Sequence, residues 1–283
     1  MKRTFRALHI IFLTLILMLS GMTSASAGNN PFVSPRGSCN SIKGTTVLVS
    51  IFVSDPVHSW DFDKKDSMDG YNRIYWRLKT ASEWLTRQAG RYGARPKIIW
   101  DWFNQPYLYY TYSSSRYLPD QEYTYGELRD FITEKIDLDK IKRYYNADSA
   151  IFFTYYNQTK KDKNGGYAWS WDFNANASEP YAVEIIWITD EDNDLEVSAG
   201  GLAHEMMHCF GAVDLYRSSD KVPQKYVNHL KSSRSKDIMY FIDYSTPDTI
   251  KEKFTDLDAY YMGLISQCKD QKNYGLIKSS FAD

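Results

Sequence analysis

The sequence predicts an α/β fold with α+β character, in which helices pack on a mixed sheet. Three observations lead to this prediction. Residues 45–54 alternate apolar side chains as a strand does, residues 69–92 carry apolar side chains at helical spacing, and residues 97–102 form a second strand-like run. Strand, helix and strand in this order begin an α/β unit with a right-handed crossover.

The first strand and the long helix have the clearest patterns. One side of the strand is formed by Val47, Val49, Ile51 and Val53. One face of the helix is formed by Ile74, Leu78, Ala81 and Leu85. Gly90 and Gly93 lie near the end of this helix, where glycine commonly stops helical structure.

Further elements follow in the same manner. We expect helices at 125–135 and 138–145, the second ending at Asn146, strands at 149–156 and 181–189, and a closing helix at 254–265. The segments 104–119, 157–180 and 217–236 are interpreted as loops. The first is rich in tyrosine, and half-buried loop packing is preferred over a sugar-binding or peptide-binding surface for these rings.

The N-terminus has the features of an export signal. Basic residues at Lys2, Arg3 and Arg6 precede an apolar run over 10–19, and Ala25-Ser26-Ala27 resembles a cleavage site. We therefore expect a signal peptide at 1–27, an N-terminal arm at 28–44 and a single domain at 45–283. The product is expected to be secreted, extracellular or associated with the cell wall, without a membrane span after signal removal, because the apolar run is too short to cross a bilayer.

Charge and cysteine content limit the possible partners and disulfides of the protein. The formal net charge is −1 and basic residues are not clustered, which argues against a nucleic-acid partner. The cysteines are Cys39, Cys209 and Cys268; export permits one disulfide, three pairings are possible, and Cys39 with Cys268 is preferred. Cys209 is interpreted as a buried apolar residue.

A metal-site pattern lies between Gly200 and Tyr216. His204 and His208 are four residues apart, so both imidazoles project from one helix face and can hold one metal ion. Glu205 follows the first histidine and is the candidate general base for a metal-bound water. Gly211 can end the helix in a left-handed turn, which would return Asp214 to the metal as third ligand.

Two other side chains stay open as the third ligand. Glu252 has a Glu-x-x-x-Asp spacing with Asp256, as in thermolysin-like enzymes, and His229 is another possible donor. Asp214 is preferred because it alone explains the helix-ending Gly211.

The sequence His204-Glu205-x-x-His208-x-x-Gly211-x-x-Asp214 resembles the zinc motif of metzincin metalloproteases, in the snapalysin-like variant with Asp as third ligand. Asp237-Ile238-Met239-Tyr240 resembles the methionine turn that lies beneath the metal in that family. The resemblance covers about forty residues, Leu202 to Tyr240. It implies Met239 as the supporting thioether and offers Tyr240 as a weak candidate for oxyanion stabilisation.

The resemblance also implies a fold. The expected domain has a twisted mixed sheet with an antiparallel edge strand, packed on two long helices. The zinc helix would divide an upper subdomain at 45–211 from a lower subdomain at 212–283. The edge strand would pair with extended substrate, and either the 181–189 strand or one near 167–173 could supply it.

The expected activity is that of a secreted zinc endopeptidase (a hydrolase), acting as a monomer on protein or peptide substrates. Two alternatives stay open: a zinc amidase or peptidase that acts on cell-wall peptide cross-links, and a non-catalytic binding protein with a structural metal. The acidic run Asp190-Glu191-Asp192-Asn193-Asp194 could bind calcium, or could be the solvated start of the next helix.

Overall fold

One sheet forms the centre of the molecule. The computed structural model describes residues 42–60, 63, 65–116, 121–157, 168–171, 182–188 and 198–277. Its strands are β1 (Thr45–Ser54), β2 (Lys97–Ile99), β3 (Tyr109–Ser113), β4 (Ser149–Asn157), β5 (Ala168–Trp171) and β6 (Ala182–Ile188). They follow the order β2-β1-β4-β6-β5, and β3 also pairs with β1. All pairs are parallel except β5 with β6.

The interior strand β1 is buried on both faces. It pairs with β4 on one side and with β2 and then β3 on the other. The side chains on both faces of β1 are buried. Leu48 and Phe52 lie on one face, and the residues predicted as one apolar side, Val47, Val49, Ile51 and Val53, lie on the other. A parallel sheet buries both faces because the crossover helices cover them, so β1 is more apolar than a one-sided strand would be.

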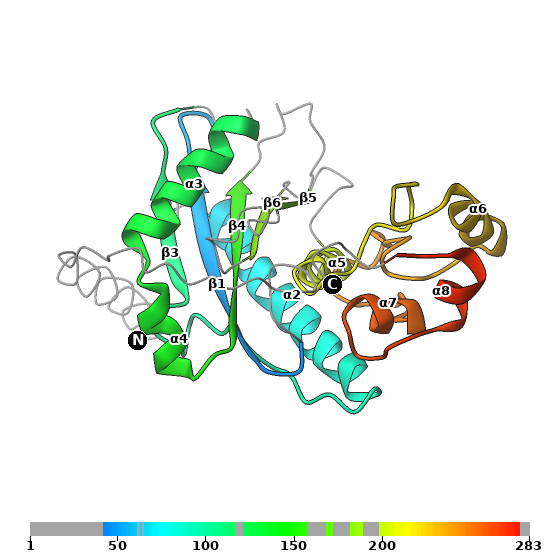
Figure 1. Cartoon of the computed structure of the whole chain (residues 1–283). Coiled ribbons are helices and arrows are strands. Elements are labelled where there is room, and N and C mark those ends of the chain that lie inside the picture. The colour runs from blue at the N-terminus through cyan, green and yellow to red at the C-terminus, as the bar shows by residue number, and fades with distance from the viewer. Residues whose placement is uncertain are drawn as a thin grey trace.

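Helices cover the two faces of the sheet (Figure 1). The long helix α2 (Lys65–Gly90) lies with α5 (Ala199–His208) on one face, while α3 (Gln121–Lys135) and α4 (Leu138–Tyr145) lie on the other. The predicted apolar stripe of α2 is buried against the core at Ile74, Leu78, Ala81 and Leu85. Helix α4 begins after Asp137, whose side chain accepts the Lys140 amide, and ends at Asn146 in a left-handed conformation.

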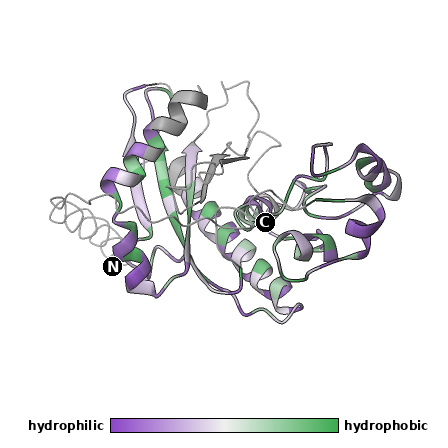
Figure 2. Cartoon of the chain, in the orientation of Figure 1, coloured by the Kyte–Doolittle hydropathy of each residue, from purple (hydrophilic) through white to green (hydrophobic). Residues whose placement is uncertain are grey.

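Short helices follow the end of α5. They are α6 (Gln224–Ser233), α7 (Asp256–Tyr261) and α8 (Lys269–Tyr274), and they lie together on the side of α5 away from β1 (Figure 1). Figure 2 shows hydrophobic residues along β1 and hydrophilic residues over much of α6 and α8. Within the described parts of the chain, no helix combines the length and apolarity that a bilayer crossing requires.

Several predicted elements are confirmed and several boundaries were wrong. The fold is mixed α/β, with seven helices among the described residues. The 97–102 strand ends at Ile99, the 125–135 helix begins at Gln121, and the 254–265 helix covers only Asp256–Tyr261. Strand β5 lies inside the predicted loop at 157–180, and it resolves the open question of the antiparallel edge: β6 lies between β4 and β5.

The other two segments interpreted as loops also contain regular structure. Tyr109–Ser113 is a strand, because its pairing with Ser50–Ser54 supplies hydrogen bonds that a run of tyrosines does not reveal by itself. Gln224–Ser233 is a helix that buries Tyr226, Val227 and Leu230, and its polar majority concealed this narrow apolar stripe.

Candidate metal centre

Helix α5 is a buried helix with a well-defined start. Ser198 precedes it in an extended conformation, and its side chain accepts the amide of Gly201 at 2.9 Å, which satisfies one of the free donors of the first turn. Every residue from Ala199 to Met207 is buried. The surrounding core therefore fixes the direction in which each α5 side chain points.

The first turn of α5 also faces a carboxylate. A Cβ atom on Gly200 would lie 3.3 Å from Oε1 of Glu252, so glycine allows the close approach of this side chain. The oxygens of Glu252 accept the amides of Asp243 and Lys251. A carboxylate near a helix N-terminus is favoured by the helix dipole, which gives Glu252 a structural explanation away from the histidines.

The end of α5 turns sharply at Gly211. Its φ is 98°, in the left-handed region where a side chain is strained. The amides of Gly211 and Ala212 bond back to the carbonyls of His208 and Met207 at 2.9 and 3.1 Å. The chain then reverses and brings Asp214 beside the histidines, as the sequence predicted.

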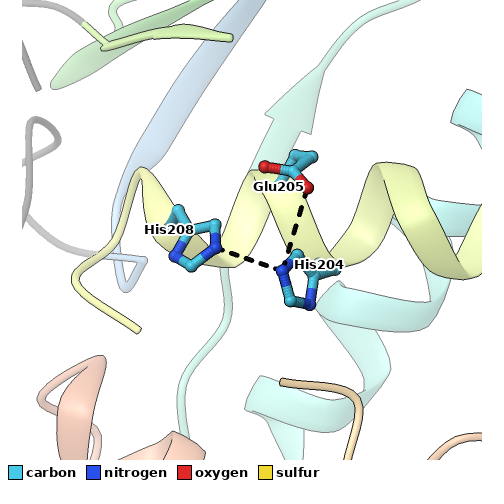
Figure 3. Close-up of side chains that lie close together, drawn as sticks. All are labelled: His204, Glu205 and His208. Atoms are coloured by element: carbon cyan, nitrogen blue, oxygen red, sulfur yellow. Dashed lines mark hydrogen bonds and ion pairs between the residues drawn. The ribbon is translucent and has the colours of Figure 1, made fainter. Parts of the chain in front are cut away.

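Three donor atoms converge there. Nε2 of His204 and Nε2 of His208 are 3.1 Å apart, and Oδ1 of Asp214 lies 3.4 Å from the first and 3.2 Å from the second. Figure 3 shows His204, Glu205 and His208 projecting from α5, with Glu205 Oε1 3.8 Å from Nε2 of His204. The group of His204, Glu205 and His208 could hold a metal ion. Asp214 Oδ1 is near enough to both imidazoles to join it.

The proton positions of the two imidazoles favour a cation between them. Nδ1 of His204 lies 3.0 Å from the carbonyl oxygen of Ile238, and Nδ1 of His208 lies 2.8 Å from that of Ala212. A carbonyl oxygen can only accept, so each Nδ1 donates in its contact, and Nε2 of each ring is the atom that faces Asp214. Oδ1 of Asp214 is buried and has no hydrogen-bond donor. Two imidazole nitrogens and a carboxylate oxygen this close need a positive charge among them, either a proton on an imidazole or a bound metal ion.

The other oxygen of Asp214 is held from outside. Oδ2 accepts the Tyr216 hydroxyl at 2.9 Å and lies 2.8 Å from Nη2 of Arg217. Burial alone would raise the pKa of Asp214, but its contacts with His204 and His208 outweigh that effect and hold the pKa well below its ordinary range. Asp214 is therefore ionised at neutral pH.

The segment that resembles a methionine turn contacts His204 through the carbonyl of Ile238. Met239 is fully buried, and the turn closes with the amides of Tyr240 and Phe241 on the Asp237 carbonyl. The Asp237 side chain accepts the Met239 amide at 2.8 Å and the Thr255 hydroxyl at 2.8 Å. The carbonyl of Ile238, held in this turn, is the one that orients His204.

The alternative ligands lie elsewhere. His229 is on α6, with its ring 5.1 Å from that of Tyr274. Cys209 is buried and its sulfur faces the Glu205 carbonyl at 3.5 Å, consistent with an apolar residue and not a ligand. Tyr240 is half-buried against the core, and its catalytic role stays a prediction.

One tyrosine near Glu205 was missed by the sequence interpretation. Tyr244 is 45% exposed, yet partial burial raises its pKa, and the carboxylates of Glu205 and Glu252 add to this effect. It lies five residues beyond Met239, and that proximity is the signal that could have identified it. Tyr216 and Arg217, two and three residues after Asp214, were missed in the same way.

Some predictions fall outside the described residues. They are the signal peptide at 1–27, most of the arm at 28–44, Cys39 and the acidic run at 190–194. The side chain of Cys268 caps α8 by accepting the Gln271 amide, and its pairing with Cys39 stays a prediction.

Comparison with known proteins adds little. No protein-family model matches the chain, and no curated protein matches it. A solved structure titled "Structure of a chaperone-substrate complex" is 15% identical, with a TM-score of 0.33, over 64% of this chain and 26% of that chain. This chain thus spans well under two thirds of that structure, and a likeness this weak carries no argument about function.

Proposed function

We propose that this chain is a secreted zinc endopeptidase, with His204, His208 and Asp214 as metal ligands and Glu205 as general base. Its substrates would be peptide bonds of proteins outside the cell. The observation that supports it best is the triangle of donor atoms, whose sides measure 3.1, 3.2 and 3.4 Å.

These separations fit a tetrahedral zinc ion. Zinc binds histidine nitrogen and carboxylate oxygen at about 2.0–2.2 Å, which places two ligands of a regular tetrahedron about 3.3 Å apart. Two imidazoles and one carboxylate also match the ligand types of catalytic zinc. Three protein ligands leave one position for water, which distinguishes a catalytic zinc site from a structural one.

The chemistry would divide between the metal and the chain. A bound zinc ion would supply a water of lowered pKa and a Lewis acid for the carbonyl oxygen of the substrate. Glu205 is buried at 7% exposure beside His204, where its carboxylate can accept a proton from water and pass it to the leaving amine. Tyr244 and Tyr240 are the candidate phenol donors to the substrate oxygen.

The arrangement of the sheet supports the metzincin resemblance. The antiparallel strand β5 is at the edge, α2 and α5 pack on one face, and the Gly211 turn precedes a buried Met239. Helix α5 contains ten residues and is shorter than the resemblance implied. An extended substrate would add by backbone hydrogen bonds to the side of β5 that pairs with no strand among the described residues, as other peptide-binding edges do.

Metal content and cleavage of unfolded casein, with and without a chelator, test the proposal. We expect one zinc per chain, cleavage that the chelator stops, and a Glu205→Gln variant that keeps zinc but loses hydrolysis. Full activity in Glu205→Gln would remove Glu205 from its role. Zinc without casein cleavage would favour the cell-wall alternative, which release of peptide from purified wall material would then test.

A further inference from the structure

We propose that Tyr216 and Arg217 are positioning residues that hold Asp214 as a one-oxygen ligand and so keep a coordination position open for water. This inference rests on the proposed zinc site. It concerns residues of this chain that lie outside the zinc motif, and it predicts what each contributes.

The geometry separates the two oxygens of Asp214. Oδ1 faces the imidazoles, while Oδ2 receives the Tyr216 hydroxyl at 2.9 Å and the Arg217 guanidinium at 2.8 Å. A carboxylate that turned both oxygens to the metal would move Oδ2 away from the position in which it accepts from these two donors. The contacts therefore oppose two-oxygen binding, which would occupy the position that water needs.

Backbone and ring contacts connect this arrangement to the turn at Met239. The Leu215 amide, between Asp214 and Tyr216, donates to the Met239 carbonyl at 2.9 Å. The ring of Tyr216 is nearly parallel to that of His204, with centroids 6.5 Å apart and an interplanar angle of 22°. Asp214 and Tyr216 are thus fixed to the same turn that orients His204 through Ile238.

Tyr216 and Arg217 should contribute unequally to holding Oδ2 of Asp214. The Arg217 side chain is 70% exposed, so water and salt screen its charge, and exposed ion pairs contribute little. Tyr216 is itself 52% exposed, but it donates from a neutral hydroxyl to the ionised carboxylate, and such a hydrogen bond depends less on salt than a pair of exposed charges does. We expect Tyr216 to dominate.

The test measures metal binding directly. Zinc affinity, by competition with a chelator, is compared among the wild type, Tyr216→Phe, Arg217→Gln and the double variant. Loss of a partner of a metal ligand typically weakens metal affinity about 10–100-fold, so we expect about a 10-fold loss for Tyr216→Phe. Arg217→Gln should lose less zinc affinity. Its loss relative to the wild type should become smaller in about 1 M salt, where the Debye length is about 3 Å.

Cobalt substitution supplies a readout that a loss of general stability would not move. The wild type should show the strong visible absorption of four-coordinate cobalt. Tyr216→Phe should shift toward the weaker absorption of five-coordinate cobalt as Asp214 turns both oxygens to the metal. Tyr144→Phe, an equally conservative change at a 58% exposed tyrosine on α4, serves as the matched control and should match the wild type.

Each outcome decides something. Wild-type zinc affinity and cobalt absorption in both Tyr216→Phe and the double variant would overturn the inference while leaving the proposed peptidase intact. Arg217→Gln changes an exposed side chain, so it folds and keeps the test valid if Tyr216→Phe does not. If the Tyr216 variants bind zinc more weakly than the wild type, but the wild type cleaves no peptide bond, the positioning role is upheld and the peptidase is refuted. A wild type without zinc affinity would refute both proposals.

Discussion

Gly211→Ala tests whether the turn after α5 builds the metal centre. Gly211 has a φ of 98°, and its turn places both the Ala212 carbonyl that orients His208 and the Asp214 carboxylate. A methyl group at this position strains the backbone. The chain can keep the turn at a cost in stability or relax it and displace Asp214.

The backbone conformation of Gly211 sets the expected loss of stability in Gly211→Ala. A residue with a side chain in the left-handed region costs about 1–2 kcal/mol relative to glycine. For a chain of this length, each 1 kcal/mol lowers Tm by about 2–4 °C, so we expect Tm to fall by about 2–8 °C. Displacement of a hydrogen-bond partner of His208 should also weaken zinc binding by about 10-fold or more.

Two matched glycines separate strain from function. Gly93, in the turn after α2, has a φ of 79° and nothing within 4 Å of an added Cβ, so Gly93→Ala should lower Tm similarly without changing zinc affinity. Gly90 also has open space but no positive φ, and Gly90→Ala should leave Tm equal or higher. Thermal unfolding of the metal-free proteins and chelator competition supply the two measurements. The reasoning about the turn is refuted if Gly211→Ala keeps both the Tm and the zinc affinity of the wild type.

Three further changes give distinct results. Asp214→Ala should loosen zinc by at least about 10-fold, and unchanged metal content in mass spectrometry would exclude Asp214 as a ligand. Met239→Ala should destabilise the metal-free fold by about 2–5 kcal/mol in urea unfolding because the side chain is fully buried; a loss below 1 kcal/mol would contradict this. Asp258→Asn concerns a buried carboxyl whose pKa burial and the nearby Asp237 charge raise well above 3.8. The fold retains a proton there that the unfolded chain releases, so wild-type stability should fall as pH rises from about 4 through the raised pKa. The neutral variant should show a shallower slope and greater stability at alkaline pH, and an identical slope would refute the argument.

Local patterns predicted the parts of the fold that they control. The apolar spacing of α2, the short helix α4 ending at Asn146 and the runs of β1, β4 and β6 were all visible in the sequence, because periodicity and end signals involve residues a few positions apart. The pair His204 and His208 was visible for the same reason, since four residues make one helical turn.

Other features depended on contacts between distant segments. Strand β3 requires pairing with β1, and the edge position of β5 is defined by its partner β6. Helix α6 lies within a polar segment whose apolar residues are few, so its burial against the core could not be inferred from composition.

The metal centre shows the same division most clearly. The sequence by itself determined which side chains could meet, through the helical spacing of the two histidines and the glycine that lets Asp214 return. Only the tertiary structure decided that the Ile238 carbonyl orients His204, that Tyr216 and Arg217 hold the outer oxygen of Asp214, and that Glu252 faces the start of α5. Helical spacing is fixed within one turn of backbone, whereas these contacts arise only when packing of the whole core brings separate segments together.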